Sequence, residues 1–198
     1  MDQFGGFGAM QQVDVDLITD AFRVSGRVQT RFGRVTDILN QLTGAHLAVE
    51  QATISEHADP SATLAAPSAV IDLASILLLS APGLTGGTSS EMRIPKRAVK
   101  AQFALPPIRV TGTIHVPMGS RPLDGLLNVT DRFLAMTDAT ITSGQYPELA
   151  RTVSAVAVSR AKVQVLLVAD DERPDELLAD VLDERTAAAW LRTDESPG

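Results

Sequence analysis

The sequence contains one pattern twice, and this repeat constrains the fold more than any other feature. With a shift of 86 residues, FRVSGRV at 22–28 lies on IRVTGTI at 108–114. With a shift of 87, residues 35–54 lie on 122–141 without a gap, and eight of the twenty aligned pairs are identical. This pattern indicates a tandem duplication. Two copies are too few for a solenoid, so we expect two similar domains related by a pseudo-two-fold axis.

Each copy is predicted to contain about five strands and one short helix. Apolar and polar residues alternate in 13–18, as in a half-buried strand. Gly26 within the second strand indicates a bulge or a close backbone contact. Thr36 and Asp37 suit the start of a short helix. The expected elements are strands 13–18, 22–28, 46–55, 69–73 and 76–80 with helix 36–42, then strands 99–104, 108–116, 133–142, 153–159 and 162–169 with helix 122–129.

The predicted fold class is α+β, mainly β: two tandem five-stranded sheets or barrels with one helix each, followed by a C-terminal helix. In helix 174–192 apolar residues recur at three- and four-residue steps, and Trp190 is the only tryptophan of the chain. The candidate residues for docking a partner are Leu178, Val181, Leu182 and Trp190. The expected domains are a flexible tail at 1–12, copy 1 at 13–81, a linker at 82–92, copy 2 at 93–170 and the helix with its tail at 171–198.

Six residues that are apolar in both copies are the predicted core. They are Leu39, Leu47, Ile54, Leu126, Leu134 and Ile141. If the predicted strand faces are correct, all six side chains should be buried, because a one-residue slip would turn them to the opposite face.

Composition narrows the range of functions. The net charge of −7 argues against broad affinity for nucleic acid, because an acidic chain repels phosphate backbones. Without cysteine, disulfides and thiolate metal sites are excluded. The first twelve residues lack the basic and apolar regions of a signal peptide. The longest apolar run, 73–81, is far shorter than the roughly 20 residues that span a bilayer. We therefore expect a cytoplasmic protein without membrane contact.

Two pairs of charged residues occupy equivalent repeat positions near the helix starts. Arg34 and Arg121 precede the helices, where they could hold an anion, bond loop carbonyls or contact the other copy. Asp37 and Asp124 could be paired acids, but the simpler interpretation is a favourable charge at a helix N-terminus.

No motif of catalysis, metal binding or cofactor binding is present in the sequence. His46, His57 and His115 share no ligand spacing, and His46 aligns with Phe133, an apolar core position. Neither a nucleophile elbow nor a glycine-rich phosphate loop is found. The basic segment RIPKRAVK at 93–100 is expected to protect a sheet edge from unwanted pairing, rather than to bind an anionic surface. We expect no enzyme activity and no cofactor.

The second copy resembles small uncharacterised bacterial β-rich domains, in which a strand with an internal glycine leads to an "RLSDxLN"-like helix and a "FLxxTDAxI" strand. The matching residues are Gly112, Arg121, Leu123, Asp124, Leu127, Asn128, Phe133, Leu134, Thr137, Asp138, Ala139 and Ile141. Copy one matches less well, with Glu50 and Gln51 in place of Thr137 and Asp138. The resemblance implies no specific activity.

Three functions are compatible with these patterns. The favoured hypothesis is a non-enzymatic protein-interaction or assembly module, since strand edges and amphipathic helices commonly dock proteins or mediate self-association. One alternative is a pair of small-ligand- or nucleic-acid-binding β-barrels. The other is an enzyme with a site between the copies.

Overall fold

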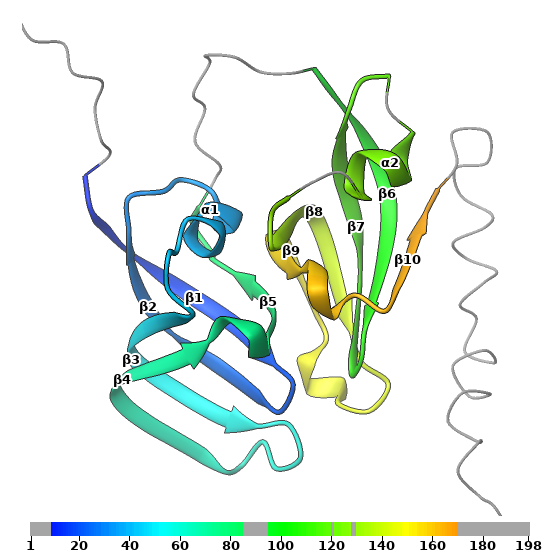
Figure 1. The fold of residues 1–198 in the computed structure, drawn as a ribbon. Helices are drawn as coiled ribbons and strands as arrows, with labels where there is room; N and C mark the ends of the chain where they lie inside the picture. Colours follow the sequence, from blue (N-terminus) through cyan, green and yellow to red (C-terminus); the bar gives the residue numbers. More distant parts are fainter. Residues whose placement is uncertain (1–8, 85–94, 120, 128–129, 170–198) are drawn as a thin grey trace, which may run out of the picture.

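The computed structural model describes residues 9–84, 95–119, 121–127 and 130–169 (Figure 1). The first half contains β1 (Gln11–Thr19), β2 (Phe22–Thr30), α1 (Val35–Asn40), β3 (His46–Glu56), β4 (Thr63–Asp72), a 3-10 turn (Leu73–Ser75) and β5 (Ile76–Ser80). The second half contains β6 (Lys96–Leu105), β7 (Ile108–Pro117), α2 (Pro122–Leu127), β8 (Phe133–Thr142), β9 (Arg151–Ser159) and β10 (Val165–Val168), with 3-10 turns at Pro147–Leu149 and Arg160–Lys162. The ten predicted strands and both short helices of the repeat are therefore present.

All ten strands form one sheet, in the order β10-β6-β7-β8-β9-β5-β1-β2-β3-β4, and every neighbouring pair is antiparallel. The predicted α+β fold class with two separate five-stranded sheets or barrels is therefore wrong: the fold is nearly all-β. The physical reason is that β5 pairs with β9, so two strands that would be sheet edges satisfy each other's backbone groups. The predicted helix 174–192 lies outside the described residues.

The strand order of the first half recurs in the second. Within the sheet, β5-β1-β2-β3-β4 corresponds to β10-β6-β7-β8-β9. Adding 87 to the bounds of α1 gives those of α2. The strands that meet between the halves are not equivalent, because β9 corresponds to β4 and β5 corresponds to β10. The predicted pseudo-two-fold axis is therefore wrong, and the halves follow each other head to tail.

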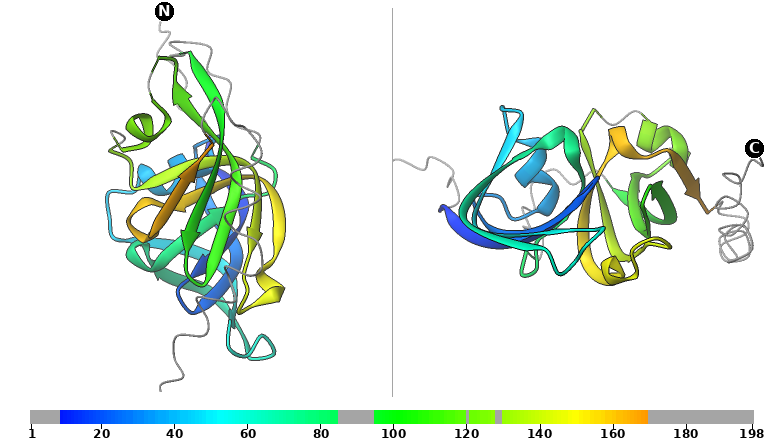
Figure 2. Two further views of the ribbon diagram at one scale, coloured as in Figure 1. Left: turned by 90° about the vertical axis from the view of Figure 1, so that its right-hand side faces the viewer. Right: turned by 90° about the horizontal axis from the view of Figure 1, so that it is seen from below.

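A β-bulge lies opposite a glycine in both halves, where Gly26 predicted a bulge or a close backbone contact. The β2–β3 register shifts between Ser25 and Arg27, and Gln51 opposite has a φ of 50°. A Cβ atom on Gly26 would lie 2.7 Å from the carbonyl oxygen of Glu50, so only glycine fits. In the second half, Gly112 and Asp138 take the same roles. Bulges bend strands, and Figure 2 shows that the sheet is strongly curved.

Two hydrophobic clusters fill the two halves, and the strands where the halves meet contribute to both. Leu79 of β5 belongs to the first-half cluster and Leu78 to the second-half cluster. A strand buried on both faces has no polar alternation, which explains the continuous apolar run of β5. The predicted core is confirmed for five residues, whereas Ile54 is half-buried. His46 lies on the surface, in contrast to the buried Phe133 at the equivalent position.

Candidate functional site

The two ends of the sheet are its most distinctive surface features. Within the described residues, β4 and β10 each pair with one strand only, β3 and β6 respectively. A strand of this kind presents a row of backbone N–H and C=O groups that can pair with a further strand. The strands are far apart in the sheet order, with eight strands between them. We call them the outer edges.

Side chains on both outer edges are apolar and exposed. Val70 of β4 is 67% exposed, Leu64 of β4 is 63% exposed, and Val165 of β10 is 50% exposed. The strand β10 carries no charged residue, and β4 carries one, Asp72 at its end. Lysine residues, which commonly protect sheet edges, are absent from both strands. Only Pro67, a residue that edge strands tolerate, limits pairing along β4.

The pairing of β5 with β9, called the joint below, shows what burial does to equivalent strands. Three residue pairs are in register at the joint: Leu78 with Val158, Leu79 with Ala157, and Ser80 with Val156. All six residues are buried, with at most 2% of the surface of any one exposed. The exposed Val70 corresponds by its number to Ala157, and Val165 corresponds to Leu78. The same strand positions are thus covered at the joint and uncovered at the outer edges.

An ion-pair cluster lies beside the joint. The Asp16 carboxylate accepts hydrogen bonds from Arg23 Nε at 3.0 Å and Nη2 at 2.9 Å. Arg151, which starts β9, brings its Nη2 within 3.3 Å of the same carboxylate. Burial lowers the pKa of Arg151, while Asp16 raises it and Arg23 lowers it. Because the side chains of Asp16 and Arg151 are each only 16% exposed, their mutual attraction is little screened.

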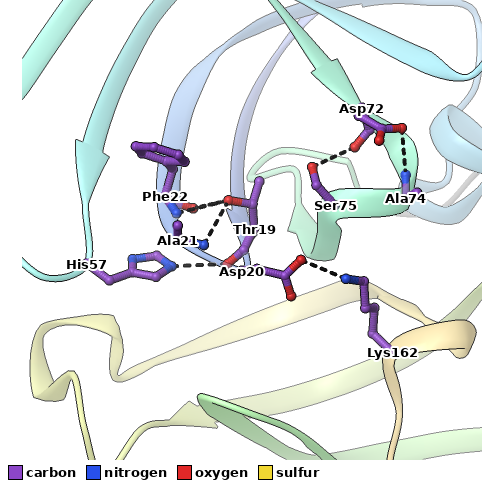
Figure 3. A network of polar contacts seen from close by, with 9 residues as sticks. All are labelled: Thr19, Asp20, Ala21, Phe22, His57, Asp72, Ala74, Ser75 and Lys162. Atoms are coloured by element: carbon purple, nitrogen blue, oxygen red, sulfur yellow. Dashed lines mark hydrogen bonds and ion pairs between the residues drawn. The ribbon is translucent and has the colours of Figure 1, made fainter.

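A second polar network connects the β1–β2 turn to the second half (Figure 3). Lys162 Nζ lies 2.6 Å from Asp20 Oδ2 in that turn. The turn is held by Thr19, whose hydroxyl accepts from the Phe22 amide at 2.9 Å. His57 donates through Nε2 to the Thr19 carbonyl at 3.1 Å, since a carbonyl can only accept. The ring of His57 also lies against Tyr146 of the second half, with the centroids 5.4 Å apart. These contacts assign a structural role to His57.

The C-terminal end of α1 contacts the second half directly. Asn40 exchanges two hydrogen bonds with the backbone of Phe133, at 3.0 and 2.9 Å. Arg132 donates to the carbonyl oxygens of Leu39 and Leu42. Phe133 itself packs into the first-half cluster. Backbone pairing, ion pairs and helix contacts therefore hold the two halves together.

The predicted charged residues do not form one site. Arg34 is exposed and immediately precedes α1, while Asp37 is half-buried in the first turn. Burial raises the pKa of Asp37, the nearby Arg34 lowers it and Asp131 of the second half raises it. Arg121 and Asp124 are exposed near α2, which lies over the second half in Figure 1. The helices α1 and α2 lie over different halves in Figure 1, so they do not bring the two pairs together. The predicted docking residues Leu178, Val181, Leu182 and Trp190 lie outside the described residues.

One hollow of about 300 Å³ lies beside the Gly26 bulge. It is lined by Asp14, Val15, Ser25, Gly26, Arg27 and Gln51. Its charged groups bind each other, because Arg27 Nε lies 3.3 Å from Asp14 Oδ1. Among the described residues, no cluster of His, Asp and Glu could hold a metal ion.

The sequence predicts that the basic segment 93–100 lies at a sheet edge. The structure describes this segment from Pro95 on, and Lys96 is the first residue of β6. This strand is an interior strand, between β7 and β10, over residues 101–104. Lys96 and Arg97 lie beyond the end of the β10 ladder, so the edge interpretation applies only to this end of the strand.

In the part of the chain that the structure describes, no helix is long and apolar enough to cross a membrane.

Sequence reasoning missed the outer edges as a candidate site. The sequence feature that could have indicated an outer edge is the apolar run at 165–169. It resembles the buried run of β5 but lies in the last strand of the sheet.

No known protein family, curated protein or solved structure shows significant similarity to this chain.

Proposed function

We propose that this chain is a non-enzymatic assembly module that joins proteins strand to strand through its outer edges. The observation that carries the proposal is the exposure of Val70 and Val165, whose counterparts at the joint are fully buried. Pairing at a sheet edge supplies main-chain hydrogen bonds, and apolar side chains add contact area and specificity. The origin of the repeat in a duplication of a small β-domain belongs to the same proposal.

Site-specific photo-crosslinking tests this function. A photoreactive amino acid is placed at Val70 or Val165, in the full chain, in cells of the source organism. Covalent protein adducts are expected from both positions. The matched control is Thr140, which is also exposed on the surface but belongs to the interior strand β8. It should give no adduct.

The positions that form adducts separate the outcomes. Adducts at the edge positions, with none at Thr140, support assembly through the edges. The absence of adducts at both Val70 and Val165 contradicts the proposal. Equal adduct formation at all three positions also contradicts it, because random collision does not distinguish an edge from a face.

A further inference from the structure

The head-to-tail arrangement of the two halves specifies a partner for the outer edges. We infer that β4 of one chain pairs antiparallel with β10 of a second copy, so that chains join as the two halves join within one chain. This inference rests on the proposed assembly function and identifies the partner at that same site. Its basis is continuity. Within the described residues, β4 and β10 each have one neighbour, and they correspond to the two strands that already pair at the joint.

The apolar surface of β10 fits burial on both faces. Residues 165–169 read VLLVA, without polar alternation, like the run ILLLSA at 76–81. Each residue of β5 is buried, whereas in β10 Val165 is exposed and the other three residues are half-buried. Leu166 and Val168 pack against the second-half cluster, which accounts for one face only. A neighbouring strand would cover what remains.

The joint also predicts the register of the contact between chains. Subtracting 87 from the β9 residues and adding 87 to the β5 residues transfers the three pairs of the joint to the outer edges. The predicted pairs are Val165 with Ile71, Leu166 with Val70, and Leu167 with Ala69 of the next chain. Pro67 lies outside this segment, so its missing N–H does not interrupt the ladder.

The contact between two copies uses a different surface of each chain, β4 of one and β10 of the other. Within the chain, β9 pairs with β5 and not with its own counterpart β4. A contact of this kind between copies is heterologous, so each chain retains one free β4 and one free β10 until a ring closes or a filament grows. A symmetric β4–β4 dimer would instead use the same edge of both chains and leave β10 of each chain uncovered.

The polar contacts of the joint do not recur at the outer edges. The counterparts of Asp16 and Arg151 are Gln102 and Leu64, so the ion pair of the joint is replaced by an uncharged pair. The contact between chains consequently relies on backbone pairing and apolar burial. We expect the chains to dissociate on dilution while the joint within each chain stays intact.

Edge-blocking variants test the pairing. Lysine on an edge strand disfavours strand addition, and both Val70 and Val165 are exposed enough to accept it without unfolding the chain. By sedimentation velocity, the unmodified full chain should form oligomers that dissociate on dilution. Val70→Lys and Val165→Lys should each be monomeric. Mixed in equal amounts they should form dimers and nothing larger, because only one intact β4 and one intact β10 remain per pair. Circular dichroism verifies that both variants are folded.

The outcomes distinguish this inference from the proposed function. The inference is overturned if the unmodified chain is monomeric at all concentrations, or if the mixed variants stay monomeric. If the unmodified chain is monomeric but Val70 still crosslinks to a different protein, the assembly function stands and only the partner is wrong. If the chain is monomeric and neither edge crosslinks, both proposals fail.

Cysteine pairs test the register, since the natural chain has no cysteine. Ile71→Cys with Val165→Cys, and Val70→Cys with Leu166→Cys, place thiols directly opposite each other across the contact. At least one of the two variants should form a ladder of disulfide-linked chains under mild oxidation. The control is Val70→Cys with Val165→Cys, in which the thiols point to opposite faces and should not link. A ladder from the control, or from none of the variants, overturns the predicted register.

Discussion

The joint and the outer edges are built from corresponding strands, yet their surfaces differ completely. Leu78 is 0% exposed at the joint, while its counterpart Val165 is 50% exposed at the end of the sheet. The strand sequences are similarly apolar, so the difference comes from the neighbour and not from the strand. An apolar edge without a neighbour is a feature that soluble proteins usually avoid. The comparison therefore supports the proposal that the outer edges are contact surfaces.

The polar contacts differ between these regions as well. The joint is accompanied by two ion pairs and by the hydrogen bonds of Asn40 with Phe133. Those contacts fix one arrangement of the two halves. At the outer edges the corresponding ion pairs are absent, as the residues in those positions are uncharged. This contrast favours a permanent contact at the joint and an exchangeable one at the edges.

The largest expected effect compares Leu79 with its counterpart Leu166. Leu79→Ala should lower the free energy of unfolding by about 2–5 kcal/mol, because it leaves a cavity in a fully buried site. Leu166→Ala should cost about 1 kcal/mol in the monomer, since Leu166 is only half-buried. Urea denaturation at a concentration where the chain is monomeric measures both. Equal losses would show that β10 is covered as completely as β5.

An intermediate effect is expected from the ion pairs. Asp16→Asn should lower the free energy of unfolding by about 2 kcal/mol, because it removes the carboxylate that Arg23 and the largely buried Arg151 share. The matched control is Asp14→Asn, whose partner Arg27 is more exposed and whose own side chain is 77% exposed. That change should cost less than about 0.5 kcal/mol. Thermal melting of both variants checks the difference, and similar losses would contradict a special role of the joint.

The smallest expected effect concerns Asp37, whose pKa is raised mainly by burial and in part by Asp131 of the second half. With a raised pKa in the folded state, protonation of Asp37 stabilises the fold. This stabilisation is fully present below the ordinary pKa of 3.8 and is lost as the pH rises through the folded-state value. Asp37→Asn should therefore raise the free energy of unfolding at pH 7, by less than about 0.5 kcal/mol, and change little at pH 3.

Urea denaturation of the Asp37→Asn variant at the two pH values measures this effect. Asp131→Asn should act in the same direction and more weakly, because its charge is only one of the causes of the raised pKa. Destabilisation of the Asp37→Asn variant at pH 7 would mean that the favourable charge at the start of α1 outweighs its burial.

Local patterns in the sequence determined the elements. Alternation in 13–18 predicts β1, the glycines at 26 and 112 predict the bulges, and the gapless match of 35–54 on 122–141 places the two helices at equivalent positions. These features depend on neighbours in the chain, on side-chain period and on backbone freedom, so they can be read from the residues. Five of the six predicted core residues were buried for the same reason, whereas Ile54 is half-buried. None of the residues of the outer edges was predicted as a site.

Only the tertiary structure decided how the two halves meet. The apolar runs at 76–80 and 165–168 look alike in sequence, but the first finds β9 and the second stays at the end of the sheet. Strand pairing between distant segments depends on which backbone edges come together in space, and the local alternation of apolar and polar residues does not reveal that choice. A repeat with equivalent strands can close around a two-fold axis or continue head to tail. Here the pairing of β5 with β9, with Asp16 and Arg151 beside it, selects the continuous sheet and leaves β4 and β10 at its ends.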